Sequence, residues 1–247
     1  MRINSYTPPG TLNNDLVVLS AEESHHLARV LRVEAGQELT LFDGQGTRAE
    51  GVVDSVTKKE VTVRITSRET VPPPAVEITL IQAVCKPDRF ELILQKATEL
   101  GVRRIQPVIT KNASLPAGKI EKMIERGEAI IRNAAQQCGT AWMPSFQGLE
   151  NPLRGGTEFF PNIGKQDVIF IGSLHPDAKP FREVFQGLDK SKIKTAALMI
   201  GPEGDFTKEE VNAAVAAGAI PVTFGTQILR TETAAIFGLS VLAYELF

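Results

Sequence analysis

The sequence predicts a small β-rich unit followed by an α/β domain that is built on a parallel sheet. Three consecutive prolines, Pro72–Pro74, favour a stiff, extended segment between the two parts, because proline donates no backbone hydrogen bond. Short strand-like runs come before the prolines, and strands that alternate with helices come after them. We therefore predict a first domain over residues 1–70 and a second domain over residues 75–247.

The first part has the pattern of a small β-barrel. Residues 60–66 alternate β-branched apolar side chains with polar ones, which is the period of a half-buried strand. Residues 38–43 and 49–56 are also strand-like, and glycine-containing or polar turns separate the runs. The barrel carries one short helix in the stretch SAEESHHLARVLRV. In that helix we expect Leu27, Val30 and Leu31 to face inward.

The second part alternates strands with helices, which predicts a parallel sheet with both faces covered. The helix over residues 88–101 has an apolar stripe and ends at Gly101. A long helix is predicted from about residue 117 to residue 138. The predicted strands are residues 76–84, 104–110, 167–172, 195–201 and 220–225.

Composition excludes several classes of protein. The net charge of −2 gives a polyanion no general attraction, so any nucleic acid would have to be held by local clusters. Cys85 and Cys138 are too few for a disulfide framework and are predicted to be buried free thiols. Three histidines without ligand spacing indicate no metal. Without a signal-peptide or membrane-span pattern, we expect a cytoplasmic protein.

Three predicted strands end at glycine, at Gly172, Gly201 and Gly225. In open α/β sheets, ligands bind beyond the carboxyl ends of the strands, and glycine lets the backbone approach them. Ordinary strand-to-helix turns are the alternative, and Thr207 with Glu210 does form a capping-box pattern after the second of these strands. The chain has no dinucleotide-binding glycine fingerprint, P-loop or nucleophile elbow. Any ligand is therefore expected to be held mainly by backbone groups in loops.

Arg230 stands at the start of the apolar C-terminal helix, where the positive end of the helix dipole disfavours a cation. Capping and the dipole account for Thr231, Glu232 and Thr233 as helix-start residues. They do not account for Arg230, which is better placed facing an anionic or electron-rich ligand.

Four stretches resemble the RsmE family of the SPOUT superfamily. They are ILRTETA (228–234), IGPEG (200–204), KPDRFELILQKATELGVRRIQPV (86–108) and HHLARVLRVEAGQELTLFDGQG (25–46). The resemblance runs from near residue 20 to the end of the chain, in the family's order. It implies an enzyme that uses S-adenosylmethionine to methylate N3 of a uridine in 16S ribosomal RNA of the 30S subunit.

The resemblance also implies a PUA-like barrel, a SPOUT sheet with a C-terminal trefoil knot, and a homodimer. The cofactor would lie bent among the knot loops. The implied cofactor-binding residues are Ile171, Gly172, Ile200, Gly201, Pro202, Glu203, Gly204, Phe224, Gly225, Ile228, Leu229, Arg230, Thr233 and Ala234. The chain departs from the family pattern at Asp205, which replaces a glycine, and at Gln136 and Thr140, which replace a glutamate and an arginine.

For Arg230 we predict a catalytic role, in which its guanidinium stabilises the negative charge on uracil O2 and O4 after N3 loses its proton. The alternative is structural, with Arg230 paired to Glu203 or Glu232 to brace the knot. Solvent or an RNA phosphate could accept the proton. On the first domain, the RNA-binding candidates are His26, Arg29 and Arg32, whose helix could also be merely solvated.

Two other functions remain open at this point. A SPOUT relative could methylate another base or a ribose 2′-hydroxyl. The chain could also be an RNA-binding protein that binds the cofactor without turnover.

Overall fold

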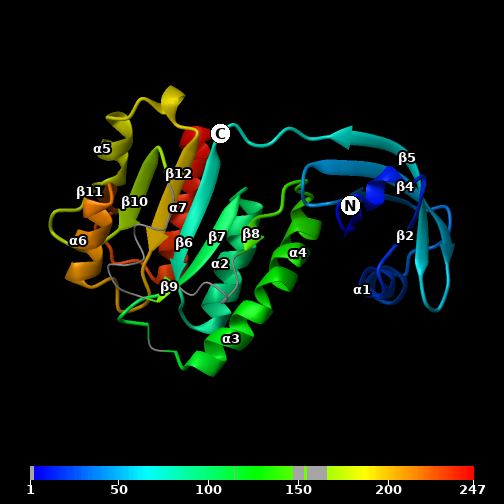
Figure 1. Cartoon of the computed structure of the whole chain (residues 1–247), viewed down its shortest axis with the longest axis horizontal. Coiled ribbons are helices and arrows are strands. Elements are labelled where there is room, and N and C mark those ends of the chain that lie inside the picture. The colour runs from blue at the N-terminus through cyan, green and yellow to red at the C-terminus, as the bar shows by residue number, and fades with distance from the viewer. Residues whose placement is uncertain (1–2, 114, 147–152, 155–165) are drawn as a thin grey trace. The chain divides into compact units, whose positions relative to one another are not determined.

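The computed structural model describes residues 3–113, 115–146, 153–154 and 166–247 (Figure 1). By their contacts, these residues form two compact units, each described by itself. The first holds residues up to Pro73 together with Arg132–Met143, and the second holds Pro74–Ile131 and Pro144–Phe247. Arg132–Met143, which the predicted boundaries assign to the second domain, therefore makes its contacts within the first unit. Within the described parts, no helix combines the length and apolar content needed to span a membrane.

The first unit is a five-stranded sheet in the order β1-β3-β4-β5-β2, antiparallel except for the β1–β3 pair. Its strands are β1 (Asn4–Tyr6), β2 (Leu16–Val18), β3 (Glu38–Phe42), β4 (Thr47–Val56) and β5 (Val61–Thr70). Its helical segments are η1 (Thr11–Asn13), α1 (Ala21–His25) and the π-helix η2 (His26–Leu31). Val61, Val63 and Ile65 lie in its core, which confirms the predicted alternation of β5.

The expected orientation of the helix in this unit is wrong at two residues. Leu27 is buried, but Val30 is 61% exposed and Leu31 is 42% exposed. The prediction assumed α-helical periodicity, whereas residues 26–31 wind as a π-helix. A π-helix bonds each residue to the fifth one along, so residues three and four after Leu27 do not return to its side.

The second unit is a parallel sheet in the order β11-β13-β10-β12-β6-β7-β8, with β9 also paired to β7. Its strands are β6 (Glu77–Ala83), β7 (Arg104–Ile109), β8 (Ser145–Phe146), β9 (Leu153–Arg154), β10 (Val168–Gly172), β11 (Lys179–Pro180), β12 (Thr195–Ile200) and β13 (Ala219–Thr223). Its helices are α2 (Pro87–Glu99), α3 (Ala117–Glu125), α5 (Phe181–Gln186), η4 (Lys190–Lys192), α6 (Lys208–Ala216) and α7 (Thr231–Leu246). Helix α4 (Gly127–Cys138) belongs to the second unit up to Ile131 and to the first unit from Arg132. The predicted parallel α/β sheet is thus confirmed.

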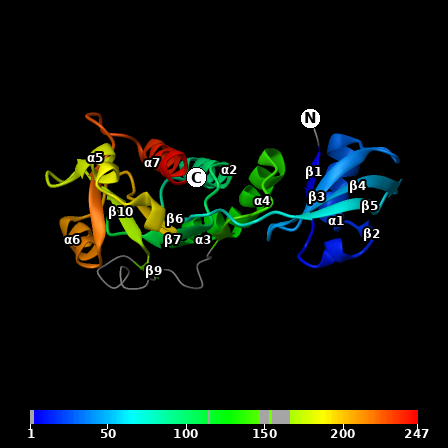
Figure 2. The same cartoon turned by 90° about the horizontal axis from the view of Figure 1, so that it is seen from above.

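Helices cover both faces of this sheet. Figure 2 shows α2 and α7 on one face and α6 on the other, and α2 packs against α7. The core under α6 joins side chains of β6, β10 and β12 to those of Val211 and Ala214. After β13, at one side of the sheet, the chain returns to α7, which packs on β12 and β6 in the middle. The trefoil knot itself stays a prediction.

The single long helix predicted over residues 117–138 is wrong, because the structure has two helices with a break at Arg126. Gly127 starts the second helix, and the ring of Phe146 occupies the place where a side chain at residue 127 would lie. The absence of a side chain at Gly127 therefore lets Phe146 of the edge strand β8 approach the helix backbone.

Candidate functional site

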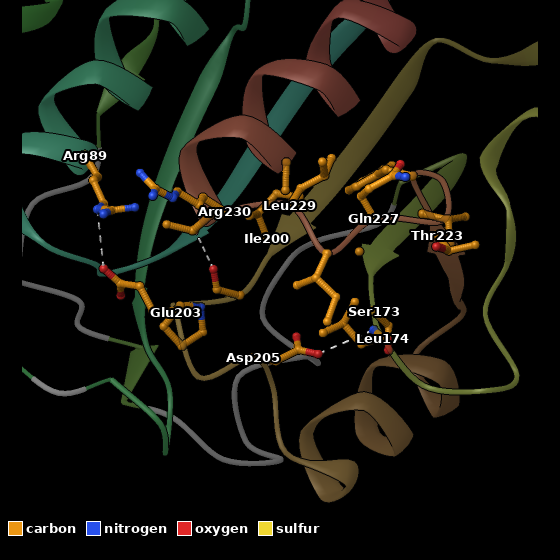
Figure 3. A pocket seen from close by; sticks show the side chains of 18 residues that line it. Arg89, Ser173, Leu174, Ile200, Glu203, Asp205, Thr223, Gln227, Leu229 and Arg230 are labelled. Atoms are coloured by element: carbon orange, nitrogen blue, oxygen red, sulfur yellow. Dashed lines mark hydrogen bonds and ion pairs between the residues drawn. The ribbon is translucent and has the colours of Figure 1, made fainter.

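A pocket of about 250 Å³ opens at the carboxyl ends of β10, β12 and β13, and we call it the first pocket (Figure 3). Its walls are the loops that follow these three strands and the first turn of α7. The predicted cofactor residues that line it are Gly172, Ile200, Gly201, Pro202, Glu203, Phe224, Ile228, Leu229, Arg230 and Ala234. Strand ends that lie far apart in the sequence thus meet at one edge of the sheet, as the glycine pattern predicts.

Four of the predicted cofactor residues do not line this pocket. Ile171 is buried in the core, and Gly204 packs against Asn112. Gly225 lines a different pocket, and Thr233 is exposed on α7. Eight further residues line the pocket that were not among the predicted cofactor-binding residues, namely Arg89, Ser173, Leu174, Asp205, Val222, Thr223, Gln227 and Thr231.

At two glycines of the wall, neighbouring atoms leave little room for a side chain. A Cβ on Gly201 would lie 3.1 Å from Asp205 Oδ1 and 3.2 Å from the Phe206 nitrogen. A Cβ on Gly172 would lie 3.0 Å from the Phe224 ring. Contacts this short are rare for real Cβ atoms, so the pocket wall at both places needs a bare backbone.

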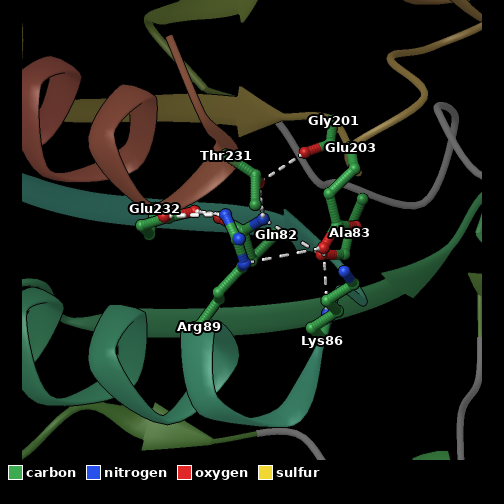
Figure 4. Close-up of polar contacts among 8 residues, drawn as sticks. All are labelled: Gln82, Ala83, Lys86, Arg89, Gly201, Glu203, Thr231 and Glu232. Atoms are coloured by element: carbon green, nitrogen blue, oxygen red, sulfur yellow. Dashed lines mark hydrogen bonds and ion pairs between the residues drawn. The ribbon is translucent and has the colours of Figure 1, made fainter.

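Thr231 ties the start of α7 to the loop after β12 (Figure 4). Its hydroxyl donates to the Gly201 carbonyl at 2.7 Å and accepts from Gln82 Nε2 at 3.2 Å. The residue that precedes α7 is Arg230, and no side chain caps the helix there. The expectation that a threonine caps this helix is therefore wrong, because the Thr231 hydroxyl bonds across to another loop.

Arg89 joins α2 to α7 beside the same pocket (Figure 4). One guanidinium nitrogen donates to both carboxylate oxygens of Glu232, at 2.8 and 3.0 Å, and Nε lies 4.0 Å from Glu203 Oε1. The hydrogen bond to Glu232 raises the pKa of Arg89, so the cation is permanent.

The Cys85 thiol is neutral. Burial, together with the negative charges of Glu203 and Glu232, raises the pKa of this thiol to about 12.

Arg230 makes no side-chain hydrogen bond or ion pair with any residue that the structure describes, and it is exposed at the pocket. Glu203 and Glu232, the partners considered for it in a bracing role, interact with Arg89 instead. Figure 3 shows Arg230 and Arg89 both lining the end of the pocket that holds Glu203.

Asp205 links two of the pocket loops. Its backbone φ of 56° lies in the left-handed region that favours glycine, and aspartate tolerates it better than most residues. Oδ1 accepts from its neighbour Phe206 at 2.8 Å, and Oδ2 accepts from the Leu174 nitrogen at 3.4 Å. A carboxylate in place of a glycine thus adds a negative charge to the pocket and connects the loop after β12 to the loop after β10.

In the first unit, His26, Arg29 and Arg32 are all exposed. Arg32 has a φ of 54° and terminates η2. None of the three takes part in an ion pair with a described residue. Their side chains are therefore free to contact another molecule.

The residues that depart from the family pattern near α4 have structural partners in the first unit. Gln136 Nε2 donates to Glu23 at 2.7 Å, and the Thr140 hydroxyl both donates to and accepts from the backbone of Trp142. The Trp142 indole N–H donates to the Val71 carbonyl at 3.0 Å. Cys138 is exposed, so the prediction of two buried thiols is wrong for one of them.

Among the described residues, no cluster of three or more His, Cys, Asp or Glu side chains is placed to hold a metal ion. The first pocket instead combines backbone groups, apolar side chains, two arginines and the carboxylates of Glu203 and Asp205. Such a set suits an organic ligand with both apolar and charged parts.

The chain matches two families of known proteins. Residues 72–243 match the RNA methyltransferase domain family, and residues 19–66 match the RNA methyltransferase PUA domain family. It is 33% identical to the ribosomal RNA small subunit methyltransferase E of Mesomycoplasma hyopneumoniae over 173 residues, which cover 66% of this chain and 68% of the relative.

Two solved structures are similar over nearly the whole chain. A Legionella pneumophila protein with bound S-adenosylmethionine has a TM-score of 0.86 and 34% identity, with 99% of this chain and 98% of that chain covered. The ribosomal RNA small subunit methyltransferase E of Neisseria gonorrhoeae, also bound to S-adenosylmethionine, has the same TM-score and coverage at 28% identity. With both domain families matched in order and the strand-end pocket in place, the chain belongs to the RsmE family of RNA methyltransferases.

Proposed function

We propose that this protein transfers a methyl group from S-adenosylmethionine to N3 of a uridine in 16S ribosomal RNA of the 30S subunit. The observation that carries the proposal is the first pocket, formed by the ends of three neighbouring parallel strands in a chain of the RsmE family. Its loops come from the segments that the sequence assigns to the cofactor.

The lining of the first pocket fits this cofactor. Gly172 and Gly201 keep bare backbone in its wall, because neighbouring atoms leave little room for a side chain at either position. Glu203 and Asp205 place negative charge where a sulfonium and an ammonium group would be attracted. When bound there, the cofactor would supply an electrophilic methyl group.

The proposed chemistry is positioning together with charge stabilisation. N3 of the uridine would lose its proton to solvent or to an RNA phosphate, and the resulting negative charge would spread to O2 and O4, where the Arg230 guanidinium stabilises it. N3 would then form a bond to the methyl carbon as the bond between that carbon and sulfur breaks, which leaves a neutral methylated base and a neutral thioether. Arg230 suits this role because none of the described carboxylates neutralises it. Holding the acceptor in line with the methyl group supplies the rest.

The first unit is proposed to bind the RNA. The exposed side chains of His26, Arg29 and Arg32 can contact phosphates, which orient the substrate without reading its sequence. Replacing Arg29 and Arg32 together by alanine should weaken 30S binding and leave cofactor affinity unchanged. The slope of log affinity against log salt concentration should become shallower by the equivalent of about two phosphate contacts. Binding isotherms at several salt concentrations measure this, and an unchanged slope would remove these residues from the interface.

The protein is further proposed to act as a homodimer in the cytoplasm. The outer side of α7 exposes the aromatic residues Phe237, Tyr244 and Phe247. A second copy would cover this apolar surface. The proposed ribosomal substrate supports a location in the cytoplasm.

The test is transfer of tritium-labelled methyl groups from S-adenosylmethionine to purified 30S subunits and to naked 16S RNA. Digested nucleosides are then separated by liquid chromatography. Label in 3-methyluridine supports the proposal, with 30S subunits preferred because the chain's net charge of −2 gives bare RNA little attraction. Label in another base or a 2′-O-methylated nucleoside would favour a different target. Cofactor binding without transfer would favour a non-catalytic RNA-binding protein.

A further inference from the structure

We infer that Arg89 is a positioning residue that keeps Arg230 free for the substrate, an inference that rests on the proposed role of Arg230. Arg89, Arg230 and Glu203 line one end of the first pocket, and Glu232 lies next to it as the partner of Arg89 (Figures 3 and 4). The structure pairs both carboxylates with one of the two arginines and neither with the other.

Arg89 holds Glu232 by two short hydrogen bonds, at 2.8 and 3.0 Å. The side chains of this pair are only 22% and 13% exposed, so water screens their attraction less than at an open surface. Arg89 Nε is also 4.0 Å from Glu203 Oε1. The same carboxylate accepts a hydrogen bond from the backbone N–H of Lys86 at 3.3 Å. Arg89 therefore neutralises Glu232 and part of the charge of Glu203.

Arg230 lies two residues before Glu232 in the sequence and lines the same pocket as Glu203. Without Arg89, Glu232 would be a largely buried carboxylate that lacks a cation, and an uncompensated buried charge is costly. A mobile guanidinium nearby would then be attracted to it. Arg230 would pair with Glu232 and no longer reach the uracil ring, so Arg89 acts on the reaction through Arg230.

Removing the competing carboxylate distinguishes positioning from a purely structural brace. In Arg89→Gln, single-turnover methyl transfer should fall about tenfold or more, toward the roughly 10²–10³-fold loss expected when a charge-stabilising donor is removed. In the double variant Arg89→Gln/Glu232→Gln, the rate should return to within about threefold of wild type. The effects of the two substitutions on the rate would then be non-additive in a double-mutant cycle. A brace predicts that the double variant stays as slow as the single one.

Chemical labelling tests the freedom of Arg230 without using activity. Phenylglyoxal reacts with accessible arginines, and mass spectrometry of peptides locates the adduct. Arg230 should react in wild type, become protected in Arg89→Gln, and react again in the double variant. Equal reactivity of Arg230 in wild type and Arg89→Gln would overturn the inference.

The controls separate this inference from the proposed function. Lys96→Gln removes an ion pair with Glu99 at 2.8 Å on the same helix, outside the pocket, and should change neither rate nor labelling. If Arg89→Gln does not fold, the single variant Glu232→Gln distinguishes the two roles. If Arg89 is a positioning residue, Glu232→Gln should keep the methyl-transfer rate within about threefold of wild type. If the pair is a structural brace, Glu232→Gln should lower that rate. If wild type transfers no methyl group, the proposed function fails, whereas the labelling pattern still shows whether Arg89 frees Arg230.

Discussion

Helix α7 borders two hollows of different character. At its N-terminus, the first pocket combines apolar side chains with backbone groups and charged side chains. Along its flank, a second pocket of about 510 Å³ is lined mainly by apolar side chains, among them Phe181, Phe224 and Phe237. Phe224 lines both, and its ring lies 5.4 Å from that of Phe181 and 5.7 Å from that of Phe237.

The difference lies in which groups already have partners. In the first pocket, Arg89, Thr231 and Asp205 all have hydrogen-bond partners within the chain, so its shape is set before a ligand arrives. Beside the second pocket, Phe237 is 43% exposed and Tyr244 is 88% exposed. A preformed pocket suits a small ligand, whereas exposed aromatic rings suit a protein surface.

The strongest expected effect is that of Gly201→Val in the first pocket. The new side chain would begin 3.1 Å from Asp205 Oδ1 and occupy the bare wall of the pocket. Calorimetry should then detect no binding of S-adenosylmethionine, while circular dichroism shows a folded protein. Gly118→Val is the matched control, because this exposed glycine on α3 has nothing within 4 Å of its Cβ position. Normal affinity in Gly201→Val would mean that the cofactor binds elsewhere.

Arg230→Ala should slow methyl transfer by about 10²–10³-fold, as does the loss of one oxyanion-hole donor. Thermal stability and cofactor affinity should stay near wild type, because the side chain makes no contact that holds the described structure together. Arg230→Lys should recover only part of the rate, since a point charge does not match a planar fork. A parallel loss of cofactor affinity and melting temperature would instead assign Arg230 a structural role.

Tyr244→Asp tests the second pocket. A central aromatic residue commonly contributes about 2 kcal/mol or more to an interface, so the dimer should dissociate roughly 30-fold more readily. Sedimentation equilibrium measures this constant. Val215→Asp, on α6 at the other face of the sheet, places the same charge on a 45% exposed apolar residue and should leave the dimer intact. A variant of Tyr244 that dimerises like wild type would place the interface elsewhere.

The smallest effect is expected from Asp205→Asn, which removes one negative charge while keeping a residue type that tolerates positive φ. S-adenosylmethionine carries a sulfonium charge that its demethylated product lacks. The ratio of the affinity for the cofactor to the affinity for the product should therefore fall about fivefold at low salt. This factor corresponds to the attraction of roughly 1 kcal/mol between opposite charges about 4 Å apart in water. Asp177→Asn, outside the pocket, is the control for overall charge. An unchanged preference would show that Asp205 serves only to connect the loops.

The position of the first pocket could be predicted because it follows from general rules of chain geometry. Parallel strands end at one edge of a sheet, so Gly172 and Gly201 had to come together once the strands were identified. The predicted capping box of Thr207 and Glu210 is also confirmed. It could be predicted because all its atoms lie within one helical turn.

Contacts between distant segments were not predictable. Arg89 and Glu232 are 143 positions apart, and nothing local to either residue indicates the other. Thr231 has the residue type of a helix cap, yet its hydroxyl bonds to Gly201 across the pocket. The error at Val30 came from a local change of helix type, which a fixed α-helical period does not anticipate.

The assignment of Arg132–Met143 to the first unit has a consequence for how the chain folds during synthesis. Glu23 is almost fully buried, with Ser5 and Gln136 as its hydrogen-bond partners. A nascent chain that ends at Pro73 would bury this carboxylate with the serine hydroxyl alone. The N-terminal unit therefore cannot reach its final state when its own strands leave the ribosome. Its last segment is supplied only after β6, β7 and α4 have also been synthesised.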